Sequence, residues 1–107
     1  MLILLDNNAP RGLAGALAGH TIIVARERGW ATLKNGDLLT AAEEAGFEVL
    51  VTSDRNIRYQ QNLEGRKIAI VALGKGRWTL IKMNLSRIVA AVNAATPASF
   101  TEVEISG

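Results

Sequence analysis

Short apolar runs separated by polar turns recur along the chain, and their spacing predicts strands that alternate with helices. The runs typical of strands cover residues 2–5, 20–25, 49–51 and 67–73. Residues 49–51 and 68–73 are apolar without alternation, which is typical of strands buried on both faces of a parallel sheet. Residues 100–105 alternate instead, as expected for an edge strand.

Helical patterns fall between these runs. Asn8 is predicted to cap a helix that begins with Pro10 and stops at Gly19. A second helix is predicted from about Asp37 to a stop at Gly46, with alanines and leucines on its inward face.

The second half of the chain continues this alternation. Residues 57–63 are predicted as a short helix, and residues 26–35 and 74–78 as loops, the former with the option of a broken helix. A last helix is predicted to be capped by Asn84 or Ser86 and to end before Pro97. The order of elements therefore predicts one α/β domain over residues 1–107, with three α/β/α layers and a mostly parallel sheet.

Composition narrows the functional classes. The chain has 107 residues, 49% of them hydrophobic and 21% charged, with a formal net charge of +2. No apolar run approaches the ~20 residues that span a bilayer, and the first residues lack the features of a signal peptide, so we expect a cytoplasmic protein. The absence of cysteine and the single histidine, His20, argue against a zinc site or a Ser-His-Asp triad.

Three aspartates are predicted to meet at one edge of the sheet. Asp6 follows the first strand, Asp54 follows the central strand, and Asp37 opens the helix that leads into the central strand. Because that helix runs antiparallel to the strands, its first turn is expected near their carboxyl ends. Clustered carboxylates repel one another unless a cation joins them, so we expect Mg²⁺ or Mn²⁺ there, clamping a phosphate and activating water. The alternative is that each aspartate only caps a turn or a helix.

Three sequence blocks carry a family resemblance. They are Leu-Leu-Asp-Asn-Asn-Ala-Pro over residues 4–10, Gly-Asp-Leu-Leu over 36–39, and Val-Leu-Val-Thr-Ser-Asp-Arg-Asn over 49–56. In order and spacing they resemble the small bacterial PIN-like proteins, compact relatives of the PIN-domain nucleases that include the VapC toxins. The resemblance runs from residue 2 to about residue 78.

The resemblance implies a metal-dependent ribonuclease, and in such families the nuclease is often the toxin of a toxin–antitoxin pair. Asp6, Asp37 and Asp54 match the first, third and fourth acidic positions of the PIN pattern, and Asn56 matches a polar position that lines the site. Asn7 stands where compact relatives commonly have an acid, and the segment that carries the second acid is missing. The implied site therefore has three carboxylates, with Asn7 and Asn56 orienting water or the scissile phosphate.

Basic residues are expected around this site. Arg55 is the first candidate for a contact with RNA; the further basic candidates are Lys34, Arg58, Lys75 and Arg77. With Tyr59 and Trp78 interleaved, such a set suits phosphates and unpaired bases. The alternative is a solvated basic surface with Trp78 covering the core.

Two other functional classes remain open. One is a non-catalytic PIN-like module that binds a protein or an RNA with the same surface. The other is a receiver-like phosphoacceptor domain, suggested by the spacing of Asp6 and Asp54, although Lys67 follows Asp54 too closely for the helix that a receiver needs. The last helix or the edge strand 100–105 could also serve a homodimer.

Overall fold

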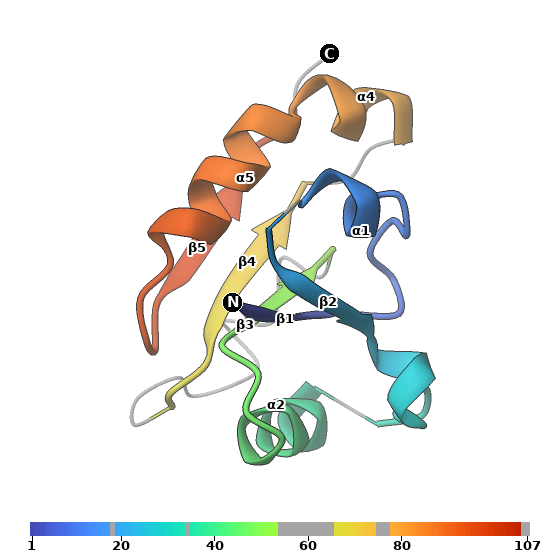
Figure 1. Cartoon of the computed structure of the whole chain (residues 1–107), viewed down its shortest axis with the longest axis vertical. Coiled ribbons are helices and arrows are strands. Elements are labelled where there is room, and N and C mark those ends of the chain that lie inside the picture. Colours follow the sequence, from blue (N-terminus) through green and yellow to red (C-terminus); the bar gives the residue numbers. More distant parts are fainter. Residues whose placement is uncertain (18, 34, 54–65, 75–77, 106–107) are drawn as a thin grey trace.

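The fold is a parallel sheet covered by helices on both faces. The computed structural model describes residues 1–17, 19–33, 35–53, 66–74 and 78–105. The described strands are β1 (Leu2–Leu5), β2 (Thr21–Val24), β3 (Val49–Thr52), β4 (Ala69–Leu73) and β5 (Phe100–Val103). They form one sheet in the order β2-β1-β3-β4-β5, and every neighbouring pair is parallel (Figure 1). The predicted α/β class is therefore confirmed.

Helical segments connect the strands. They are α1 (Leu13–Ala16), the 3₁₀ turn η1 (Ala25–Arg28), α2 (Asn35–Glu44), α4 (Trp78–Met83) and α5 (Leu85–Ala94). Gly46 follows α2 with φ +88°, a left-handed backbone conformation that glycine adopts without steric cost, which explains the stop predicted there. None of the described helices is long and apolar enough to cross a membrane.

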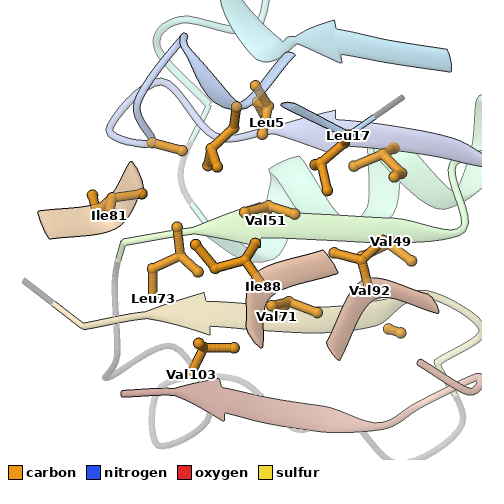
Figure 2. Packing of buried hydrophobic residues seen from close by; sticks show 14 of the residues in the cluster. Leu5, Leu17, Val49, Val51, Val71, Leu73, Ile81, Ile88, Val92 and Val103 are labelled. Carbon is orange, nitrogen blue, oxygen red and sulfur yellow. The ribbon is translucent and has the colours of Figure 1, made fainter. Parts of the chain in front are cut away.

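Alternation of side chains along the strands divides the core in two. Even-numbered strand residues such as Leu4, Leu50 and Ile70 pack with Leu38 and Leu39 of α2. Odd-numbered residues of β1, β3, β4 and β5, together with Ile22 and Val24 of β2, pack with α1, α4 and α5 on the opposite face. The labelled members of this second cluster in Figure 2 are Leu5, Leu17, Val49, Val51, Val71, Leu73, Ile81, Ile88, Val92 and Val103. The period of two residues along a strand thus produces the three layers.

Two predicted helices differ from the structure. The first helix is only one turn, Leu13–Ala16, and its N-cap is Gly12 rather than Asn8, whose side chain bonds across the sheet instead. Residues 78–83, in part assigned to a loop, form α4, and Asn84 separates it from α5. Asn84 is the N-cap residue of α5, as predicted, but it makes no side-chain cap bond to that helix and donates its side-chain amide to the carbonyl of Leu80 at 2.8 Å. The helix predicted over 57–63 lies outside the described residues.

Trp78, at the start of α4, is 39% exposed and lies against Gly12. A Cβ atom at Gly12 would lie 2.8 Å from Cε2 of the Trp78 ring, closer than side chains tolerate. Because a bulkier residue would displace the ring, we expect Gly12→Ala to lower the free energy of unfolding by about 1–3 kcal/mol, as overpacking does. Urea unfolding followed by tryptophan fluorescence measures this loss.

The matched control for this prediction is Gly15→Ala in α1. A Cβ atom at Gly15 has nothing within 4 Å, so the substitution should leave the stability unchanged or raise it, by up to about 1 kcal/mol, through helix propensity. Equal stability of the Gly12 and Gly15 variants would show that the contact between Trp78 and Gly12 does not restrict the chain.

Candidate active site at the carboxyl ends of β1 and β3

The candidate site lies where the strand order reverses. From β1 the chain moves outward to β2, then returns past β1 to β3 and continues to β4 and β5. In open α/β sheets the helices on either side of such a switch point diverge, and ligands bind in the crevice outside the carboxyl ends of the two strands. Asp6 follows β1 at this position and Thr52 ends β3. The polar residues of both strand ends are therefore placed where doubly wound folds bind ligands.

Asp6 is buried and held in place by three hydrogen bonds. Its backbone N–H donates to the carbonyl of Val51 at 2.9 Å, which extends the pairing of β1 with β3 by one residue. Its Oδ2 accepts the Thr52 hydroxyl at 2.8 Å, and its Oδ1 accepts the backbone N–H of Asn7 at 2.7 Å. An ionised carboxylate offers about four acceptor positions, so two such bonds leave capacity for a further partner. Asp6 is thus a fixed carboxylate that remains able to bind a ligand.

The alternation of side chains along the strands explains why the side chains of Asp6 and Thr52 lie on the same face of the sheet and form a hydrogen bond. Both are even-numbered, and even-numbered side chains of β1 and β3 point to the face covered by α2. Thr52 is fully buried, and a buried hydroxyl needs a partner, which the Asp6 carboxylate supplies. Sequence reasoning missed Thr52 as a site residue, although its position two residues after Leu50 is the signal that could have found it.

The two asparagines after Asp6 connect the site to its neighbours. The side-chain carbonyl of Asn8 accepts the backbone N–H of Ser53 at 3.0 Å and lies 3.4 Å from the Thr52 hydroxyl. Asn7 donates its amide to the carbonyl of Ala31, in the segment before α2, over a long 3.5 Å. Asn8 therefore fixes the turn after β3 relative to the turn after β1. Asn7 links the site to the segment that precedes α2.

Asn7 also presents an unsatisfied acceptor. Its side-chain oxygen is buried and receives no hydrogen bond from any residue that the structure describes. A buried polar atom without a partner costs stability unless a ligand completes it. Carboxylate and amide oxygens are the ligands that Mg²⁺ and Mn²⁺ prefer, so Asp6 with Asn7 fits the donor set of a hard cation.

Of the other predicted ligands, only Asp37 lies in the described part of the chain. Asp37 lies in the first turn of α2, as predicted, and is exposed. Among the described residues, no three carboxylate or imidazole groups lie close enough to hold a metal ion. Asp54, Arg55, Asn56, Arg58, Lys75 and Arg77 lie outside the described residues, as do Lys34 and Tyr59.

At the opposite edge of the sheet, the amino ends of β3 and β4 line a hollow of about 440 Å³. Its wall includes Glu43, which lies 2.8 Å from Arg66 and accepts the backbone N–H of Lys67 at 3.1 Å. Burial alone would raise the pKa of Glu43, but the hydrogen bonds and positive charges of Arg66 and Lys67 hold that pKa below its ordinary value. The ion pair between Glu43 and Arg66 connects α2 to the segment that precedes β4, at the edge of the sheet opposite Asp6.

Comparison with known proteins adds no assignment. No family model, no curated protein and no solved structure matches the chain.

Proposed function

We propose that the chain is a PIN-like, metal-dependent ribonuclease whose active site is the edge formed by the carboxyl ends of β1 and β3. The observation that carries the proposal is the buried, hydrogen-bonded Asp6 carboxylate beside the unsatisfied side-chain oxygen of Asn7 at the switch point of the sheet. The order of Asp6, Asp37 and Asp54 in the sequence supports the same site. Antitoxin pairing belongs to the same proposal and rests on the family resemblance alone.

Each residue has a distinct role in this proposal. Asp6, with Asp37 and Asp54, would hold Mg²⁺ or Mn²⁺, and Asn7 and Asn56 would orient water or phosphate. A divalent cation bound there would neutralise charge on the phosphate and lower the pKa of bound water. Thr52 acts through Asp6, because its hydroxyl fixes one carboxylate oxygen and leaves the remaining acceptor positions for the ligand.

Thermal unfolding with and without millimolar Mn²⁺ tests the metal site directly. A ligand present at a hundred times its dissociation constant stabilises the folded state by about 2.7 kcal/mol, which shifts the unfolding temperature by many degrees in a domain of this size. We expect Mn²⁺ to stabilise the native protein and Asp54→Asn to remove most of that gain, because one of three proposed carboxylate ligands is lost.

The control for this experiment is Glu48→Gln, an exposed carboxylate that precedes β3 at the opposite edge of the sheet. It removes the same charge and should keep the full response to Mn²⁺. If native protein and Asp54→Asn respond to Mn²⁺ alike, the metal site is not where we place it. If neither responds and no preparation cleaves RNA, the non-catalytic binding module replaces the nuclease.

A further inference from the structure

The 3₁₀ turn η1 presents two arginines on the same edge of the sheet as Asp6. It follows β2 directly, and β2 lies beside β1 in the sheet (Figure 1). In the register of this pair, Val24 lies opposite Leu5. Residues 25 and 6 therefore leave neighbouring strands at equivalent positions, and neighbouring strands are about 4.8 Å apart. Arg26 and Arg28 are both exposed. The backbones of both arginines thus follow β2 at the edge of the sheet that carries Asp6.

The backbone of this turn is held rigidly. Glu27 accepts the backbone N–H of Val24 through its carboxylate at 3.2 Å. Gly29 ends the turn in a left-handed conformation with φ +80°. The backbone N–H of Trp30 then donates to the carbonyl of Ala25 at 3.1 Å. The segment then reaches Ala31, whose carbonyl accepts the long hydrogen bond from Asn7. The turn is therefore fixed relative to the residues that follow β1.

Arg28 makes cation–π contacts with two aromatic rings. Its guanidinium carbon lies 5.0 Å from the centre of the Trp30 ring and 6.0 Å from that of Phe47, and the two rings meet edge to face at 6.0 Å. Such contacts leave guanidinium N–H donors for phosphate oxygens. The aromatic pair thus limits the rotamers of Arg28 and keeps its charge available.

The acidic group of the turn accepts a hydrogen bond from the backbone. Glu27 is the one carboxylate within η1, and it is engaged by the backbone of Val24. In the part of the chain that the structure describes, neither Arg26 nor Arg28 takes part in an ion pair. Exposed arginines on a rigid turn suit a polyanion better than they suit the interior of the fold.

We infer that η1 is a phosphate-binding surface that holds the backbone of a single RNA strand beside Asp6, with Arg26 and Arg28 each contacting a phosphate. The inference rests on the proposed ribonuclease function for the identity of the polyanion. The inference adds η1 to the surfaces that would bind the RNA strand. The sequence had suggested only the basic residues within 55–58 and 75–77 and Lys34.

Binding of a fluorescein-labelled 20-nucleotide oligouridylate in EDTA, followed by fluorescence anisotropy from 25 to 200 mM salt, tests the surface without any cleavage. For single strands, the slope of log K against log salt changes by about 0.7 for each phosphate contact. We expect the double variant Arg26→Gln/Arg28→Gln to bind at least about fivefold more weakly at low salt and to flatten the slope by about 1.4.

The matched control is Arg87→Gln, an exposed arginine on α5, the helix that packs on β4 and β5. It removes one positive charge and should leave affinity and slope close to those of the native protein. The single variant Arg26→Gln keeps the contacts of Arg28 with the aromatic pair, so it should fold even if the double variant does not. We expect it to show half of the change in slope.

Three results would overturn the inference: no binding of the oligonucleotide by the native protein, unchanged affinity and slope in the double variant, or an equal loss in Arg87→Gln. Because the assay contains no metal, binding that depends on Arg26 and Arg28 supports the surface even if cleavage is never found. Cleavage with no contribution from the two arginines would leave the nuclease proposal standing and remove this one.

Discussion

Replacing Leu50 by alanine is expected to lower the free energy of unfolding by about 2–5 kcal/mol, the range found when a fully buried leucine is truncated. Leu50 is completely buried in the central strand β3, between Leu4 of β1 and Ile70 of β4. Its neighbours on α2 cannot move inward without losing their own contacts with the sheet, so a cavity remains. For a domain that is stable by only about 5–15 kcal/mol, this is a large share of the total.

Chemical denaturation with urea measures the loss, and Met83→Ala is its control. The Met83 side chain is 72% exposed on α4, so its truncation should change the stability by no more than about 0.5 kcal/mol. A loss at Leu50 as small as the loss at Met83 would mean that the α2 face of the sheet is not closely packed. The m-value should stay constant in both variants if only the folded state is affected.

The strands could be predicted from sequence because their apolar runs match what a buried parallel sheet requires. Residues 2–5, 49–51 and 68–73 are apolar at successive positions, and each forms a strand whose side chains alternate between two covered faces. The stop of α2 at Gly46 was predictable for a local reason as well, because glycine alone adopts a left-handed conformation without cost.

Helix ends near the candidate site were not predictable, because long-range hydrogen bonds decide them. Asn8 has the local properties of a helix cap, yet its side chain bonds to Ser53, which is 45 positions away in sequence. With that oxygen engaged, the chain from Pro10 to Gly12 forms turns and α1 contains a single turn of helix. The boundary between α4 and α5 is different, because Asn84 stands at the N-cap position that the sequence pattern indicated and its amide makes a local bond to Leu80, four residues back.

The candidate site was predictable in its position and only partly in its composition. Asp6 at the carboxyl edge follows from the topology of any parallel α/β sheet. The partner of Asp6 depends on which face each side chain takes, and that follows from the register of β1 with β3, which pairs Leu5 with Val51. Sequence reasoning did not use that register, so it concentrated on charged residues and left out Thr52. Burial, rather than charge, makes this hydroxyl important.

Asp6→Asn is expected to reduce Mn²⁺-dependent cleavage of RNA by at least about a hundredfold, equivalent to roughly 3 kcal/mol of transition-state stabilisation at 1.36 kcal/mol per tenfold. Asparagine has nearly the same shape as aspartate, and its remaining oxygen still accepts either the Thr52 hydroxyl or the N–H of Asn7. The negative charge that would hold the cation is lost. The fold should therefore survive, while the proposed site loses a ligand.

Initial rates on a fluorophore-quencher RNA oligonucleotide, with Mn²⁺ and with EDTA, measure this effect for native protein, Asp6→Asn and Glu48→Gln purified in parallel. Glu48→Gln removes a carboxylate at the opposite edge of the sheet, so it should cleave at the native rate. Cleavage that persists in EDTA, or that is the same in all three proteins, would identify a contaminating ribonuclease and leave the chain without demonstrated activity. Cleavage that needs Mn²⁺ and survives Asp6→Asn would refute the assignment of Asp6, because a buried carboxylate at the switch point would then serve only to hold Thr52.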